Sequence, residues 1–239
     1  MKPFSILGQP FVKNNTSYDI SYSASANSKG ARLVIKLIEN ITGRIALIKR
    51  ASGYKKDISS SGKTFWEIIL QIYKIDLEAL SGDINNIPSE GPLILVCNHP
   101  FGILDGLLLG YLLSKRRNDF RIFAHHIFKG YDDLTNVILP INFDETREAV
   151  NQNIITRGIA LDYLKNGGCI GIFPGGTVST AIKPFGQPID PSWRRFTAKL
   201  VTKSDARVLP VFFHGSNSHL FQIASHINQN LRLALLIRE

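Results

Sequence analysis

Short apolar runs alternate with longer amphipathic segments from Pro92 to the end of the chain, and this alternation constrains the fold more than any other feature. The apolar runs predict β-strands at 93–97, 120–124, 137–142, 169–173, 207–213 and 231–237. The segments between them predict helices at 104–115, 147–165, 193–203 and 217–226. Strands that alternate with helices favour a mostly parallel sheet flanked by helices on both faces. The sequence therefore predicts an α/β fold.

The part of the chain before Pro88 has a different pattern of apolar residues and divides into two regions. Residues 1–28 are rich in Ser, Asn and Tyr without a clear period, and we expect a flexible or loosely docked arm there. Residues 29–87 carry apolar side chains at helical spacing, which predicts amphipathic helices over 31–50 and 65–80. Residues 88–239 then form the α/β domain.

The helical region is strongly basic. Between Lys29 and Lys63 there are nine lysines and arginines against two acidic residues. Two interpretations stay open: a solvated helix face above a core-packing stripe, or a monotopic membrane dock with basic side chains on anionic head groups. The formal net charge of +9 for the whole chain favours anionic partners of several kinds, among them a membrane surface, an acidic carrier protein, a phosphorylated cofactor and nucleic acid.

Several classes of protein are disfavoured by what the sequence lacks. No secretory signal is visible at the start, and no window offers about 20 uninterrupted apolar residues for a transmembrane helix. Cys97 and Cys169 lie inside apolar runs, so we expect buried, reduced thiols and a cytoplasmic compartment. No Cys/His spacing resembles a zinc site, and we expect no metal.

The segment Asn98-His99-Pro100-Phe101-Gly102-Ile103-Leu104-Asp105-Gly106 carries the clearest chemistry. His99 leaves a predicted strand, and Asp105 follows at the start of an apolar helix. An imidazole can accept a proton near neutral pH, and a carboxylate can fix its tautomer, so the pair predicts a general base. The alternative is that His99 orders a loop while Asp105 only caps the helix.

The segment Phe173-Pro174-Gly175-Gly176-Thr177-Val178-Ser179 follows another predicted strand. Gly175 and Gly176 can present backbone N–H groups to an anion or a developing oxyanion, and Thr177 and Ser179 add hydroxyl donors. The alternative is a plain strand-to-loop turn, for which Pro-Gly-Gly is well suited. Both segments come just after strand ends, where ligands gather in parallel sheets. Two adjacent arginines after Trp193, Arg194 and Arg195, could hold a phosphate or lie on the exposed face of the helix that starts there.

These two segments, in this order, resemble the lysophospholipid acyltransferase superfamily, the family of glycerol-phosphate acyltransferases, with its N-H-x4-D and F-P-E-G-T-R-S blocks. A closer resemblance is to a bacterial branch labelled hemolysin-like and linked to ornithine-lipid acylation. Members of that branch read N-H-P-x-G-x-x-D-G and later V-P-V-x-F-x-G-x-N-S, which corresponds here to Leu209–Ser218. The resemblance covers roughly residues 88–239.

The resemblance implies an α/β acyltransferase of membrane lipid synthesis. His99 would be the general base on the acceptor hydroxyl or amine, and Asp105 would orient it. The predicted substrate-binding residues are Asn98, Gly102, Phe173, Pro174, Gly175, Gly176, Thr177 and Ser179. The donor would be a thioester of acyl carrier protein or coenzyme A, with no other cofactor, and the acceptor a lyso-lipid. The enzyme would lie peripherally on the cytoplasmic face of the membrane.

Two positions depart from the broad family. Gly175 and Val178 stand where the family has Glu and Arg, and that Arg would be expected to meet an acceptor phosphate. Its absence favours an amino-acid-containing lyso-lipid as the acceptor. The alternative classes are a cytolysin, a catalytically inactive relative, and a basic nucleic-acid-binding module. The last would need exposed aromatic side chains on the sheet, whereas the predicted strands are apolar on both faces.

Overall fold

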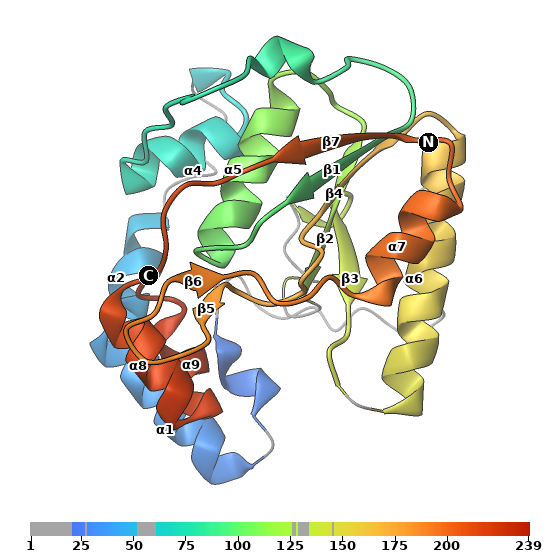
Figure 1. Ribbon diagram of the computed structural model, residues 1–239. Helices are drawn as coiled ribbons and strands as arrows, with labels where there is room; N and C mark the ends of the chain where they lie inside the picture. Colours follow the sequence, from blue (N-terminus) through green and yellow to red (C-terminus); the bar gives the residue numbers. More distant parts are fainter. Residues whose placement is uncertain (1–20, 27, 52–60, 126–127, 129–133, 145) are drawn as a thin grey trace.

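Strand β1 (Leu93–Cys97) lies inside a five-stranded sheet, between β4 and β7, in the computed structural model (Figure 1). The structure describes residues 21–26, 28–51, 61–125, 128, 134–144 and 146–239. The strand order is β3-β2-β4-β1-β7, and every neighbouring pair is parallel. The other strands are β2 (Phe120–His125), β3 (Ile138–Ile141), β4 (Cys169–Ile172) and β7 (Arg207–Val211). The predicted α/β fold with a parallel sheet is confirmed.

Helices cover both faces of this sheet because the side chains of β1 alternate between two cores. Leu93 and Leu95 pack toward α5 (Ile103–Ser114) and α4 (Phe65–Tyr73). Ile94 and Val96 pack on the opposite face toward α6 (Arg147–Lys165) and α7 (Arg195–Thr202). All five residues of β1 are buried, as expected for a strand with helices on either side. Figure 1 shows α4 and α5 on one side of the sheet and α6 and α7 on the other.

A third group of elements lies together in the lower part of Figure 1. It comprises η1 (Tyr22–Ser25), α1 (Lys29–Ile41), α2 (Arg44–Ala51), β5 (Thr180–Ala181), β6 (Pro188–Ile189), α8 (His219–Ile227) and α9 (Gln229–Leu235). The short helix η2 (Ile84–Asn86) lies outside this group and precedes β1 in the chain. Helix α9 packs against both α1 and α8, and β5 and β6 form an antiparallel hairpin beside α8. This group places α9 against α1, a helix that precedes the main sheet in the chain.

The predicted strand at 231–237 is wrong, since these residues belong to α9 and the turn after it. Asn228 caps the helix by accepting a hydrogen bond from the backbone N–H of Asn230 at 2.8 Å. Leu235, Leu236 and Ile237 are all buried against α1, α8 and their neighbours. A short run that is apolar except for Arg232 has no period that separates a buried strand from a buried helix, so the pattern did not distinguish the two.

The two predicted N-terminal helices are shorter than expected. The first is interrupted at Thr42-Gly43, where Gly43 has a φ of +129°, so that α1 and α2 are separate helices. The second ends at Tyr73, because Lys74 takes the left-handed conformation with a φ of +55°. Leu80 therefore lies outside the helix and is exposed.

Helix α1 presents an apolar stripe to solvent. Leu33, Leu37 and Ile41 expose 74%, 59% and 75% of their surface. The buried residues of α1 are Ile35 and Glu39, on a different face. The exposed apolar stripe of α1 is therefore not the face of this helix that packs into the core.

The part of the expected N-terminal arm that the structure describes, residues 21–26, packs against α1. Tyr22 is buried, and its backbone N–H donates to the Glu39 carboxylate at 2.7 Å. The Ser21 hydroxyl donates to the same carboxylate at 2.6 Å. Burial raises the pKa of Glu39, which these two donors partly offset. Residues 1–20 lie outside the described residues.

Cys97 and Cys169 are buried and form no disulfide, as expected. Burial raises the pKa of both thiols above the ordinary value. In the described part of the chain, none of the helices has the length and apolar character needed to cross a bilayer.

Candidate active site

His99 and Asp105 contact each other directly at the carboxyl end of β1. The His99 Nδ1 atom lies 2.8 Å from Asp105 Oδ2. The aspartate side chain is fully buried, whereas the imidazole keeps 17% of its surface exposed. A carboxylate only accepts hydrogen bonds, so in the neutral ring Nδ1 carries the proton and Nε2 keeps its lone pair. A histidine in this state is able to accept a proton from a ligand.

The local chain geometry holds Asp105 in place. Besides His99, Asp105 Oδ2 accepts the backbone N–H groups of Phe101 and Gly102, each at 2.8 Å. Gly102 has a φ of +97°, a conformation that side-chain-bearing residues rarely adopt, and this turns the loop into α5. Asp105 therefore caps the helix and contacts the histidine at once. The two interpretations of this carboxylate, as cap and as histidine partner, are both geometrically satisfied.

The loop from Phe173 to Ser179 lies against His99, as the sequence predicts for two strand ends at one edge. The Phe173 ring stacks on the imidazole, with a centroid separation of 4.3 Å and an interplanar angle of 21°. The backbone N–H of Ser179 donates to the His99 carbonyl at 2.8 Å. Gly176, with a φ of +70°, donates its N–H to the Phe173 carbonyl at 3.0 Å and closes the turn. Its amide is thus used within the loop.

Gly175 and Pro174 are buried, and Gly175 is packed tightly against a neighbouring segment. A Cβ atom built at Gly175 would come within 2.9 Å of Pro191 Cγ and 3.3 Å of the Pro191 carbonyl oxygen. The glutamate that the broad family has at this position has no space here. Thr177, by contrast, is exposed.

Asp190 is a site residue that the sequence reasoning missed. It follows β6 and accepts the backbone N–H of His99 at 3.1 Å. The Ser179 hydroxyl donates to the same Asp190 oxygen. Asp190 therefore joins the loop after β1 that carries His99 (residues 98–102, the histidine loop) to the loop from Phe173 to Ser179 (the glycine loop). No local pattern marks it, because the short β5–β6 hairpin that carries it has no strong period in sequence.

Two arginines from distant segments reach the glycine loop. Arg232, on α9, donates from Nη2 to Thr177 Oγ1 at 3.0 Å and to the Val178 carbonyl at 2.8 Å. Arg194 donates its backbone N–H to the Pro174 carbonyl at 3.0 Å and its Nε–H to the Gly175 carbonyl at 3.3 Å. The sequence pattern indicates Arg194 and Arg195 together as a candidate phosphate site, whereas Arg232 lies in a segment predicted as a strand.

Asn98 faces another strand end. Its side-chain Nδ2 donates to the Phe213 carbonyl at 2.8 Å, and its Oδ1 accepts the Phe213 backbone N–H at 2.7 Å. Both ends of the amide are thus engaged with the segment after β7. This pairing ties the histidine loop to the neighbouring strand.

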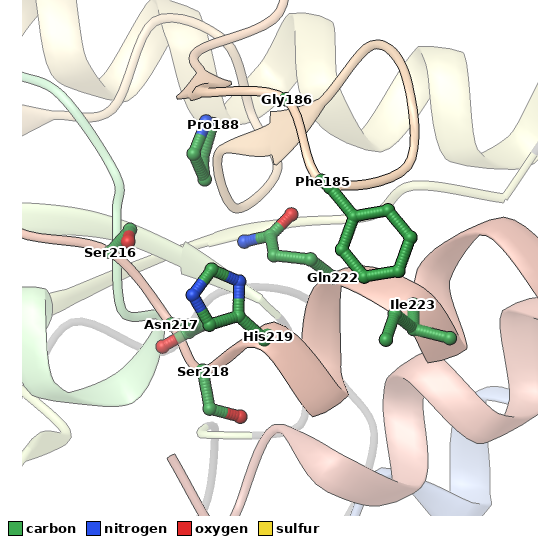
Figure 2. A pocket seen from close by; sticks show the side chains of 9 residues that line it. All are labelled: Phe185, Gly186, Pro188, Ser216, Asn217, Ser218, His219, Gln222 and Ile223. Atoms are coloured by element: carbon green, nitrogen blue, oxygen red, sulfur yellow. The ribbon is translucent and has the colours of Figure 1, made fainter.

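Two cavities adjoin this group of loops. The first has a volume of 310 Å³ and is lined by residues that include Thr177, Val178, Asp190, Pro191 and Arg232. The second has a volume of 210 Å³ and lies between the β5–β6 hairpin and the start of α8, as Figure 2 shows.

The second cavity is lined by amide side chains. Asn217 and Gln222 are each 4% exposed, and in the described part of the chain neither side-chain atom of Asn217 nor the Gln222 nitrogen has a hydrogen-bond partner. Figure 2 shows His219 and Gln222 projecting from α8 toward the hairpin. Unpaired buried amides indicate a place for a polar ligand or water.

Among the described residues, no group of three His, Cys, Asp or Glu side chains is arranged to hold a metal ion.

Comparison with known proteins identifies the family. A family model described as "Acyltransferase" matches residues 34–238. A protein of Phocaeicola vulgatus named lyso-glycine lipid O-acyltransferase is 26% identical over 167 residues, which are 70% of this chain and 57% of that protein. A protein of the same name from Bacteroides thetaiotaomicron is 26% identical over 161 residues, 67% of this chain and 56% of that protein.

This chain thus spans a little over half the length of these two relatives. The family match extends over most of the chain and includes His99, Asp105 and the whole glycine loop. The protein therefore belongs to the acyltransferase family.

Proposed function

We propose that this protein transfers a fatty acyl group from a thioester to a hydroxyl group of a lyso-lipid, with His99 as the general base. The contact of 2.8 Å between His99 Nδ1 and the buried Asp105 carboxylate carries this proposal. It leaves Nε2 as the basic atom of a partly exposed ring, beside a loop of backbone amides.

The reaction is a single displacement. The acceptor hydroxyl attacks the thioester carbonyl carbon while its proton passes to His99 Nε2, and a tetrahedral oxyanion forms. Asp105 stabilises the imidazolium through Nδ1. The backbone N–H groups of Gly175 and Thr177 are proposed to stabilise the oxyanion, since Pro174 has no N–H and that of Gly176 bonds within the loop. The C–S bond then breaks, and the leaving thiolate takes the proton from Nε2. No covalent enzyme intermediate is needed.

The names of the two relatives support a lyso-lipid acceptor with an amino-acid head group. Both are called lyso-glycine lipid O-acyltransferases. The ornithine-lipid branch suggested by the sequence motifs shares this type of head group. The loop itself also favours it, because Val178 replaces the arginine that would be expected to meet a phosphate.

The donor is proposed to be acyl carrier protein or coenzyme A. Both present the thioester on a pantetheine arm, which contains two amide groups and so both donates and accepts hydrogen bonds. The unpaired amide of Asn217 and the unpaired amide nitrogen of Gln222 offer matching partners in the cavity of Figure 2. The formal net charge of +9 suits an anionic donor.

The apolar stripe of α1 is proposed to dock the enzyme on the cytoplasmic face of the membrane as a peripheral protein. Leu33, Leu37 and Ile41 project to solvent from a region rich in lysine and arginine. An exposed apolar stripe with basic flanks is the pattern that binds anionic lipid interfaces. The lipid acceptor would then be reached without leaving the bilayer surface.

The test is acyl transfer by the purified full chain from acyl-acyl carrier protein and acyl-coenzyme A to a panel of lyso-lipids. Transfer by the wild type and a loss of about 10²- to 10⁴-fold in kcat for His99→Ala are expected. His214→Ala, a histidine of the exposed loop after β7, serves as the matched control and keeps its activity. A folded wild-type protein that acylates no lyso-lipid would refute the proposal.

A further inference from the structure

Arg232 is brought to the glycine loop by α9. It lies in the last turn of that short helix, which packs against α1 and α8, and its guanidinium extends toward Thr177 and Val178. Its Nη2 atom makes both hydrogen bonds, at 3.0 Å to Thr177 Oγ1 and at 2.8 Å to the Val178 carbonyl. Within the described part of the chain, its Nε and Nη1 groups make no hydrogen bond.

The charge of this guanidinium has no protein counter-ion among the described residues, since its two hydrogen-bond partners are neutral oxygens. The side chain is half-buried, and burial lowers the pKa of Arg232. A partly desolvated cation with free donors is costly unless an anion pairs with it. The guanidinium fork is shaped to bind the two oxygens of a carboxylate.

The cavity beside Arg232 has space for such a group. It has a volume of 310 Å³, and Arg232 and Asp190 are the charged residues among those that line it. Asp190 accepts hydrogen bonds from the His99 backbone N–H and the Ser179 hydroxyl, so Arg232 remains the group that would pair with a ligand anion. A phosphate monoester would bring up to two negative charges toward Asp190, whereas a carboxylate would bring one. The exposed side chains of Ile182 and Ile189 add an apolar rim suited to a lipid chain.

The same cavity is linked to His99 by short contacts. Asp190 accepts the His99 backbone N–H at 3.1 Å, and Ser179 donates its backbone N–H to the His99 carbonyl at 2.8 Å. Thr177, which binds Arg232, is two residues from Ser179, a separation of about 7 Å at most along the chain. Asp190, which lines this cavity, thus also bonds to the backbone of His99, and the acceptor lipid is taken to extend from Arg232 to the imidazole.

We propose that Arg232 is the specificity-determining residue that binds a carboxylate in the head group of the acceptor lipid. The inference rests on the proposed acyl transfer and narrows it to acceptors whose head group is an amino acid joined through its nitrogen, which leaves the carboxylate free. In this proposal Arg232 of α9 supplies the positive charge that the broad family has as an arginine at the position of Val178.

The test compares two acceptors that differ in one charge: a lyso-lipid built on N-acylated glycine, and the same lipid as its methyl ester. For Arg232→Gln, KM for the free acid rises by about 10- to 100-fold, as for loss of a charge-assisted pair, while kcat and the KM for the ester change little. Arg232→Lys keeps part of the preference for the acid. Arg238→Gln, an exposed arginine after α9, is the matched control and behaves as the wild type.

Two results would overturn the assignment. An equal loss of transfer to acid and ester in Arg232→Gln would show that Arg232 only braces the loop. A wild-type preference for a lyso-lipid with a phosphate head group over the carboxylate would show that the anion is of another class.

A binding measurement separates this inference from the proposed function. If the wild type transfers acyl groups to no acceptor, the proposed function fails, and calorimetric titration with N-octanoylglycine and its methyl ester still tests Arg232. Wild type and Arg238→Gln should bind the acid more tightly than the ester, and Arg232→Gln should bind both alike. Equal affinity of the wild type for acid and ester would refute the role of Arg232.

Discussion

The backbone N–H of His99 donates a hydrogen bond of 3.1 Å to Asp190, which lies 91 positions later in the chain. The same Asp190 oxygen accepts the Ser179 hydroxyl, and Ser179 returns its own backbone N–H to the His99 carbonyl at 2.8 Å. These three residues close a ring of hydrogen bonds around the backbone of the proposed base. Asp190 does not touch the imidazole, so its effect on His99 is one of position.

Asp190→Ala is therefore expected to lower kcat by about 10- to 100-fold, because small displacements of a catalytic group cost that much. Asp190→Asn keeps an accepting oxygen at the same place and should retain most of the activity. Asp205→Ala, an exposed carboxylate before β7, is the control for charge. Steady-state kinetics measure kcat for the three variants and the wild type. A loss in Asp190→Asn as large as in Asp190→Ala would show that charge, not position, is what Asp190 contributes.

Asp105→Asn tests the charge that Asp105 supplies to His99. The amide oxygen should take the Oδ2 position, because the N–H groups of Phe101 and Gly102 donate there, so Nδ1 keeps its proton but the imidazolium loses its negative partner. A loss of about 10²- to 10⁴-fold in kcat is expected. Because Asp105 Oδ2 also accepts the N–H groups of Phe101 and Gly102, thermal unfolding of the variant must be measured alongside its activity. Full activity in a stable variant would contradict the proposed stabilisation of the imidazolium by the Asp105 charge.

Gly175→Ala is expected to lower the free energy of unfolding by about 1–3 kcal/mol through overpacking. Its Cβ would lie 2.9 Å from Pro191 Cγ, in a ring that cannot rotate away. Gly158→Ala in α6 is the matched control, since a Cβ there meets no atom within 4 Å. That control should be stabilised by up to about 1 kcal/mol through helix propensity. Urea titration of both variants measures the difference, and equal stabilities would contradict the packing argument.

The Glu67–Lys115 pair links α4 to α5 and predicts a dependence of stability on pH. The hydrogen bond from Lys115, at 2.5 Å, lowers the pKa of Glu67 to about 2. A depressed carboxyl pKa contributes stability above the unfolded value, and that contribution disappears as the pH falls through the folded value. Glu67→Gln should thus cost up to about 1 kcal/mol at neutral pH.

The difference between wild type and Glu67→Gln should shrink as the pH is lowered from about 5 toward 2, the range between the unfolded and folded pKa values. Chemical unfolding at several pH values measures it. Lys115→Met should remove most of the same dependence. A constant difference across this range would contradict the assignment.

Leu33→Ser/Leu37→Ser should reduce binding to anionic vesicles by at least about tenfold, since two apolar side chains would no longer enter the lipid interface. Both leucines are exposed, so the fold is retained. The matched control is Val150→Ser/Ile154→Ser, which changes two exposed apolar residues of α6. Vesicle sedimentation with phosphatidylglycerol vesicles compares the pairs. Equal losses in both would argue against a dock at α1.

The strands of the main sheet and their parallel order could be predicted from the sequence. Period and composition identify all five strands of the main sheet, and the parallel arrangement follows from the helices between them. His99 and the glycine loop come after two such strands, so their meeting at one edge is a consequence of parallel order. The contact between His99 and Asp105 is also local, because six residues around a glycine turn leave few other arrangements.

Tertiary structure alone decided the remaining parts of the site. Asp190 and Arg232 reach the glycine loop from a short hairpin and from the last helix, and no periodic pattern marks either residue. The run after Leu231 is apolar enough for a buried strand or a buried helix, and its packing against α1 and α8 selects the helix. That choice turns Arg232 toward the loop, because side-chain direction depends on the period of the backbone, and the backbone here is set by contacts between distant segments.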